Sequence, residues 1–131
     1  MVSTHIVQIG PGQKKENKPT QAVLAGDFMY LSGQYPKDLV TGKILSKNIQ
    51  DQIRAIFFNL SKILSAQSLS LSNIVKITAY LRSEGDAPMF ENALATYFES
   101  HHPALTVVLI DRFLYKDAQL CVDAVAFVER D

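Results

Sequence analysis

Two segments of the chain, IVKITAYL (74–81) and ALTVVLI (104–110), are apolar at nearly every position rather than at alternate positions. Both are rich in β-branched residues, which is typical of β-strands. Strands that are apolar on both sides belong to a sheet that needs cover on both faces. Because the rest of the chain predicts only two helices, one face of this sheet would stay uncovered. We expect another copy of the chain to cover it.

The clearer of the two predicted helices begins at Ser46. Its apolar residues recur at steps of three and four, which gives one apolar face. They are Ile49, Ile53, Ile56, Phe57, Leu60, Ile63 and Leu64. The opposite, polar face is assigned to Lys47, Gln50, Gln52, Arg54, Asn59 and Lys62. A second helix is predicted with Asp86 as its cap and Pro88 in its first turn, and Pro103 closes it.

Strands are predicted at residues 4–9, 21–25, 27–34, 74–81, 104–113 and 119–128. The element order is therefore β-β-β-α-β-α-β-β, and one sheet with both helices on one face satisfies it. The chain of 131 residues shows no internal repeat or linker. We predict a single α+β domain that spans residues 1–131.

The charge balance argues against a general nucleic-acid binder. Lys+Arg and Asp+Glu number 13 each, so the formal net charge is zero, whereas such binders show a basic excess or stripe. The basic spot at residues 14–18 is interrupted by Glu16 and predicts a solvated loop. A net charge near zero also favours a closed oligomer.

The number of cysteines and the length of the apolar runs indicate in which cellular compartment the protein would work. The single cysteine, Cys121, leaves no disulfide framework, and its apolar surroundings predict a buried, inert thiol. No secretory signal is visible at the N-terminus, and no apolar run approaches the roughly 18 residues that span a membrane. We expect a cytoplasmic protein without a membrane partner.

The residue types that carry chemistry are few. His5, His101 and His102 lack ligand neighbours at metal spacing, so no metal site is predicted. The glycines are scattered and form no phosphate-binding motif. Asp123 stands out because it lies inside LCVDAVAFV, where a carboxylate is rare unless it is paired or functional. It either faces solvent at a sheet edge or lies in a cleft, where it could hold or transfer a proton.

Several stretches together resemble the Rid family, the reactive-intermediate deaminases also called YjgF-type or liver perchloric-acid-soluble proteins. In chain order they are FMYLSGQYP (28–36), DLVTGK (38–43), SLSLSNIVKITAYL (68–81), ENALATYF (91–98), PALTVVL (103–109) and VDAVAF (122–127). The resemblance implies a fold like the chorismate mutase of bacilli, with a six-stranded mixed sheet, two helices on one face and a homotrimer packed through the other. It also implies hydrolysis of imines and enamines to a 2-keto acid and ammonia. The sites would lie in clefts between subunits and need no metal or organic cofactor.

The chain departs from the active branch of that family at the ligand site. Leu105 stands where an arginine clamps the substrate carboxylate through two parallel hydrogen bonds, an interaction that suits a planar guanidinium. Val107 stands where a cysteine is frequent, and Pro19 replaces a tyrosine that lines the pocket. Loss of one partner of a desolvated charge pair costs about 2–5 kcal/mol.

Other positions of the family site are retained. Asp123 matches the glutamate that positions water and is shorter by one methylene, while Ser32, Gly33 and Asn92 match pocket residues. We therefore expect a divergent homotrimer with weak or absent deaminase activity that binds a small, less anionic metabolite between subunits. A non-catalytic binding protein is the alternative. Endoribonuclease or translation-inhibitor activity is less favoured by the charge balance.

Overall fold

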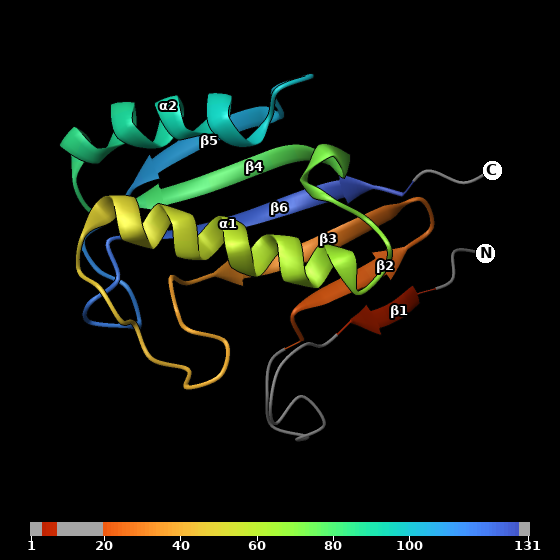
Figure 1. Ribbon diagram of the computed structural model, residues 1–131, viewed down its shortest axis with the longest axis horizontal. Helices are drawn as coiled ribbons and strands as arrows, with labels where there is room; N and C mark the ends of the chain where they lie inside the picture. The colour runs from red at the N-terminus through yellow and green to blue at the C-terminus, as the bar shows by residue number, and fades with distance from the viewer. Residues whose placement is uncertain (1–3, 8–19, 129–131) are drawn as a thin grey trace.

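The computed structural model describes residues 4–7 and 20–128, which form one mixed sheet with two helices on the same face (Figure 1). The order of the six strands is β1-β2-β3-β6-β4-β5. β4 and β5 pair in parallel and the other neighbours are antiparallel. The strands are β1 Thr4–Val7, β2 Ala22–Ala25, β3 Phe28–Gln34, β4 Ile74–Leu81, β5 Ala104–Leu109 and β6 Leu120–Phe127. The helices are α1 Ile49–Ser65 and α2 Ala87–Tyr97, with short 3-10 turns η1 Leu71–Asn73 and η2 Glu84–Asp86. The predicted α+β architecture is confirmed.

The end of β5 differs from the prediction. β5 ends at Leu109 rather than at residue 113, because its partner β4 ends at Leu81 and offers no further pairing. Residues 8 and 9 of the predicted first strand lie outside the described residues. The β2–β3 hairpin turns at Gly26, whose φ of 61° is a conformation that glycine adopts without strain.

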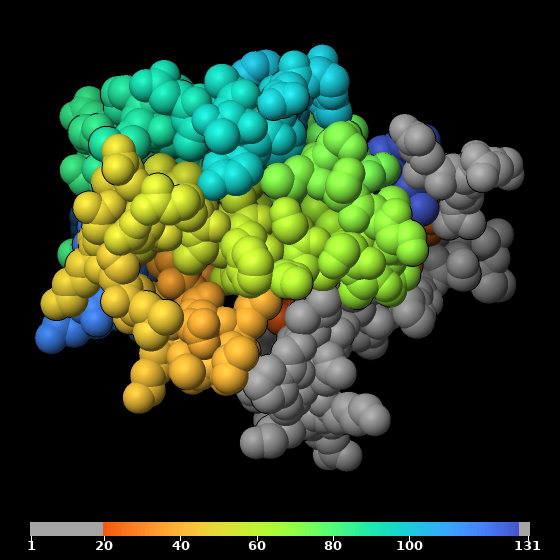
Figure 2. All heavy atoms as spheres, in the orientation of Figure 1, coloured from red at the N-terminus to blue at the C-terminus, as the bar shows by residue number. Residues whose placement is uncertain are grey.

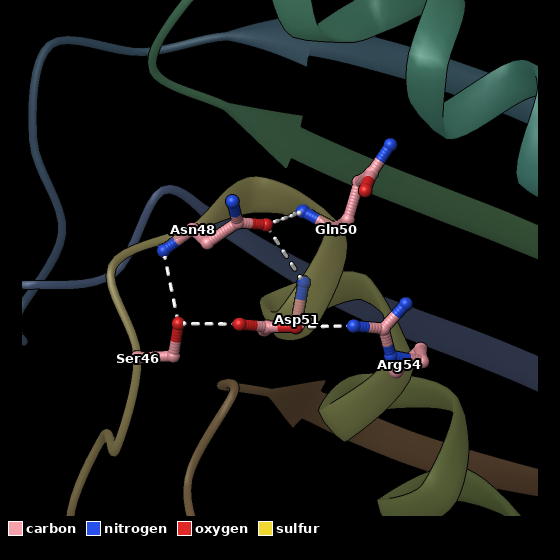
Figure 3. A network of polar contacts seen from close by, with 5 residues as sticks. All are labelled: Ser46, Asn48, Gln50, Asp51 and Arg54. Atoms are coloured by element: carbon pink, nitrogen blue, oxygen red, sulfur yellow. Dashed lines mark hydrogen bonds and ion pairs between the residues drawn. The ribbon is translucent and has the colours of Figure 1, made fainter.

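The N-terminus of α1 is fixed by Asn48 rather than by Ser46. The Asn48 side-chain oxygen accepts hydrogen bonds from the backbone N–H groups of Gln50 (2.8 Å) and Asp51 (3.2 Å), as Figure 3 shows. Ser46 donates its hydroxyl to the Asp51 carboxylate at 2.8 Å, and Arg54 pairs with the same carboxylate (Figure 3). The helix therefore begins at Ile49, where side-chain capping satisfies the first free backbone donors.

Two residues that the sequence placed on the polar face of α1 are buried. Gln52 is 1% exposed and Asn59 is 2% exposed. Gln52 donates to the Ser46 and Asp117 carbonyls, both at 2.8 Å, and accepts from the Gln119 N–H at 2.7 Å. The polar-face assignment of Gln52 and Asn59 was wrong because loops cover these amides and satisfy their hydrogen bonds.

The predicted cap of α2 is also corrected. Asp86 occupies the position before the helix, but its side chain caps no backbone N–H. Its backbone is already helical because η2 runs directly into α2. Pro88 lies in the first turn as predicted, and Phe90 and Leu94 are buried against the sheet and α1.

Among residues 4–7 and 20–128, no helix covers the face of the sheet opposite α1 and α2, which we call the open face. The side chains of β6 alternate: Val122, Ala124 and Ala126 are buried on the helix side, and successive strand residues point to opposite faces. Three aromatic residues of the open face stay partly exposed: Phe28 at 38%, Tyr30 at 49% and Phe127 at 40%. Phe28 lies beside Tyr30 and Phe127, with ring centroids 6.5 and 5.6 Å apart respectively.

The open face is not apolar throughout, contrary to the expectation from IVKITAYL. The residues that β4 presents there are Lys76, Thr78 and Tyr80, because Ile77, Ala79 and Leu81 between them are buried on the helix side. The open face therefore has an aromatic part on β3 and β6 and a polar part on β4. Among the described residues, no helix is long and apolar enough to cross a bilayer.

Candidate functional site

Asp123 lies in the middle of the sheet, on the open face. Its strand β6 runs between β3 and β4, so the interpretation of Asp123 as an edge residue is wrong. Asp123 pairs with Thr78 across the β4–β6 ladder. Its carboxylate accepts a hydrogen bond of 3.1 Å from the Tyr80 hydroxyl. This half-buried pair is the polar centre of the open face.

The hydrogen bond has an electrostatic signature at Tyr80. The Asp123 carboxylate raises the pKa of Tyr80 above its ordinary value. It accepts a hydrogen bond from the neutral phenol, and its negative charge disfavours the tyrosinate. A carboxylate disfavours a second negative charge beside it. The phenol therefore stays a donor at neutral pH and holds one carboxylate oxygen, which leaves the other oxygen available for a water or ligand.

Cys121 precedes Asp123 by two residues and lies on the same face of β6. Burial raises the pKa of the Cys121 thiol to about 11, and the negative charge of Asp123 adds to the shift, whereas the Tyr35 hydroxyl acts in the opposite direction. The thiol is therefore protonated at neutral pH, as the prediction of an inert cysteine requires. A Cβ atom at Gly33 would lie 2.9 Å from the Cys121 sulfur, so this close approach explains why a glycine stands at position 33.

Ser32 and Gly33 lie beside this centre at an irregularity in the β3–β6 ladder. The register shifts between Leu31 and Gln34, which displaces the two residues from regular pairing. The Ser32 hydroxyl donates to the Gln21 carbonyl at 3.0 Å, and the Ser32 N–H donates to the same oxygen at 2.8 Å. Ser32 is therefore held in place, and its hydroxyl oxygen accepts a hydrogen bond of 3.4 Å from the Gln34 side-chain amide.

The structure does not bring the other predicted site residues to Asp123 within one chain. Leu105 and Val107 pack against the core on the helix side, where they pair with the buried residues Ile77 and Ala79. Asn92 is exposed on α2, on the helix side of the sheet. Pro19 lies outside the described residues. Their part in a site therefore stays a prediction that requires a second copy of the chain.

Sequence reasoning missed Lys76 and Tyr80. The polar residues of IVKITAYL stand at every second position, Lys76, Thr78 and Tyr80, and this period of two places them on one face of a strand. That alternation was the available signal, and the apolar character of the segment as a whole obscured it.

Two hollows lie away from Asp123. One, of about 350 Å³, is bounded by α1 and the connection from Pro36 to Ser46, which runs beside the helix in Figure 2. The other, of about 400 Å³, lies at the end of α2 and includes His101. The His101 ring nitrogen Nε2 lies 3.2 Å from the Ile74 carbonyl oxygen, so it serves as a donor that ties this connection to β4. Within residues 4–7 and 20–128, no cluster of His, Cys, Asp and Glu could hold a metal ion.

The chain has relatives of known sequence and structure. The family model described as endoribonuclease L-PSP matches residues 14–128. A RutC family protein of Pyrococcus horikoshii is 36% identical over 110 residues, which cover 84% of this chain and 86% of that relative. The 2-iminobutanoate/2-iminopropanoate deaminase of Dermatophagoides farinae is 27% identical over 110 residues, covering 84% of this chain and 85% of that one. The crystal structure of yeast Mmf1 matches with a TM-score of 0.85 at 26% identity, over 97% of this chain and 100% of that one.

Proposed function

The chain belongs to the Rid family, also described as endoribonuclease L-PSP, and we propose that it is a divergent member that forms a homotrimer and binds a small metabolite between its copies. The observation that carries the proposal is the position of Asp123. Its carboxylate, held by Tyr80, stands on the same open face of the sheet as the exposed aromatic residues Phe28, Tyr30 and Phe127. The open face, which we propose is covered by another copy of the chain, therefore also carries Asp123, the candidate acid or base.

The chemistry that suits this arrangement is imine hydrolysis. In that reaction the oxygen of a water bonds to the imine carbon, ammonia leaves, and a nearby group must accept and return the proton of the water. Asp123 is the candidate for that role, and the Ser32 hydroxyl and Gly33 backbone supply a hydrogen-bonding wall. The relative from Dermatophagoides farinae is named for deamination of 2-iminobutanoate and 2-iminopropanoate.

Leu105 sets the expected level of activity. A leucine offers no hydrogen bond to a substrate carboxylate and surrounds it with hydrocarbon, which raises the cost of desolvating the anion. Losing the charged partner of the substrate carboxylate costs about 2–5 kcal/mol, which corresponds to a rate or a binding constant that is lower by roughly 30- to several-thousand-fold. We therefore expect weak or absent turnover of 2-iminobutanoate.

The test compares the wild-type protein with Leu105→Arg, using 2-iminobutanoate generated in situ by threonine dehydratase. The expected result is a wild-type rate near the background and a gain of at least tenfold in the variant, which Asp123→Asn abolishes. Leu109→Arg is the matched control, because Leu109 lies on the same strand and is 53% exposed. Rapid hydrolysis by the wild-type protein would contradict the account of Leu105.

A non-catalytic binding protein is the second candidate, and the packing of Leu105 and Val107 against the core favours it. In one chain these two residues pack against the hydrophobic core and do not lie on the face that carries Asp123. If Leu105→Arg folds but both proteins stay inactive, and no keto acid or amine raises the melting temperature, this second function replaces the first.

A further inference from the structure

The hollow beside α1 lies between two fixed contacts that join the helix to the connection from Pro36 to Ser46. Gln52 donates to the Ser46 carbonyl at 2.8 Å. Asn59, seven residues or about two helical turns later, donates to the Lys37 carbonyl at 2.9 Å. The connection is therefore fastened to α1 near both of its ends. The hollow of about 350 Å³ between these contacts is large enough for a small ligand.

Asn59 supplies a hydrogen-bond acceptor to this hollow. Its side-chain nitrogen donates to the Tyr35 and Lys37 carbonyls, so both of its N–H bonds are used. No donor of residues 4–7 and 20–128 reaches the Asn59 Oδ1 atom, although Asn59 is only 2% exposed. Because no fully buried side-chain oxygen of these residues lacks a partner, Oδ1 is not sealed within the protein. It opens onto the hollow that Asn59 lines.

The other uncharged side chains of the lining are mainly apolar. Phe58 and Leu45 line the hollow and remain 56% and 72% exposed. Pro36 and Leu39 add apolar surface from the connection. Ala55 has the smallest side chain among the helix residues of the lining, which leaves room beside the Phe58 ring. An aromatic ring seated there would gain from offset or edge-to-face contact with Phe58.

The charged residues of the lining balance one another. Lys37 and Arg54 are positive, and Asp38 and Asp51 are negative. Asp51 pairs with Arg54 (Figure 3), and the Asp38 carboxylate accepts from two backbone N–H groups of its own turn. The Lys37 ammonium donates to the Tyr115 hydroxyl at 2.8 Å. An ionic ligand would have to compete with these partners, so the hollow favours an uncharged one.

We propose that this hollow is a second ligand site, and that it takes uncharged, flat ring compounds that carry an N–H donor. The ring lies against Phe58 in the space that Ala55 leaves, and its N–H group donates to the Asn59 Oδ1 atom. The site lies beside α1 on the helix side of the sheet, away from Asp123. The inference therefore goes beyond the proposed function and does not rest on it.

The test measures the Kd of indole and of benzofuran by NMR titration of the full-length, isotope-labelled protein. Benzofuran has the shape of indole but an oxygen in place of the N–H group. Indole should bind in the millimolar range and shift the backbone signals of residues that line the hollow. Benzofuran should bind roughly two- to tenfold more weakly, which is the range expected for the loss of one neutral hydrogen bond.

Two variants test where indole binds. Ala55→Leu fills the hollow with a residue that helices accept readily, and it should raise the Kd of both compounds by at least about tenfold. Phe58→Ala should weaken both compounds and keep the preference for indole. Gln50→Leu is the matched control, because it adds the same side chain to an exposed position of α1 outside the lining.

Gln50→Leu should leave both Kd values unchanged, and the backbone spectrum of each variant verifies that it is folded. Three results would each overturn the inference. They are equal Kd values for indole and benzofuran, unchanged binding of indole by folded Ala55→Leu, and no binding of indole by the wild type in the millimolar range.

Discussion

The Tyr80 hydroxyl and the Asp123 carboxylate lie 3.1 Å apart on the open face, and the carboxylate raises the pKa of Tyr80. We predict that Asp123→Asn lowers the pKa of Tyr80 toward its ordinary value, because the negative charge that disfavours the tyrosinate is removed. Tyrosine carbon chemical shifts followed from pH 8 to 12 measure this directly, with Tyr80→Phe to assign the signal. An unchanged Tyr80 titration in Asp123→Asn would show that the two groups are not coupled in solution.

Cys121 makes the stability of the protein fall as the pH rises, whereas a paired carboxylate makes it fall as the pH drops. Its pKa is raised by burial from an ordinary value of 9.0 to about 11, so the folded protein holds this proton more tightly than the unfolded chain. The resulting stabilisation is fully present below pH 9 and is lost as the pH rises through 11, by about 2–3 kcal/mol. Urea unfolding between pH 8 and 11 should show this loss in the wild type and a smaller one in Cys121→Ser, because the hydroxyl does not ionise in this range. If the free energy of unfolding falls with pH equally in the two proteins, the thiol is not desolvated in the folded state.

Helix α1 depends on a buried amide as much as on its apolar face. Gln52 joins the backbone at Ser46, Asp117 and Gln119 through three hydrogen bonds. We predict that Gln52→Leu lowers the free energy of unfolding by about 2–4 kcal/mol, because it leaves buried backbone groups unsatisfied. Gln50→Leu, on the exposed side of the same helix, should change it by less than about 0.5 kcal/mol. Equal effects of the two substitutions in denaturant titrations would contradict this role of Gln52.

The secondary structure was predicted correctly where the residue pattern of a segment and its packing in the fold favour the same conformation. Residues 74–81 were predicted as a strand with the bounds that β4 has, because a segment rich in β-branched residues favours the extended conformation. Gln52 and Asn59 were misplaced because a helical wheel does not reveal which loops return to cover an amide. The end of β5 at Leu109 depends on where its partner ends, which is a property of the sheet and not of the segment.

The candidate site was predictable only in part. Asp123 stood out as a carboxylate in an apolar strand, and the structure places it at the centre of the open face. Its neighbours Tyr80 and Thr78 come from β4, 43 and 45 residues earlier in the chain (123 − 80 and 123 − 78), so only the pairing register identifies them. The roles of Leu105 and Val107 depend on a second copy, which the sequence of one chain cannot position.

The open face is the surface through which we expect copies of the chain to associate. Phe28, Tyr30 and Phe127 form an aromatic cluster that one chain leaves partly exposed, and contiguous exposed apolar surface marks an interaction site. A charge introduced into this cluster, as in Tyr30→Glu, should shift the assembly toward smaller species. Val40→Glu is the control, because Val40 is 77% exposed in the connection between Pro36 and Ser46, away from the open face.

The most direct test of the proposed assembly is the solution mass of the wild-type protein, measured by light scattering at micromolar concentration. We predict a mass near three times the 14.6 kDa of one chain, because we propose that other copies cover the open face and complete the site around Asp123. A mass of one chain would contradict it, since the aromatic cluster would then face water and no intersubunit cleft would exist.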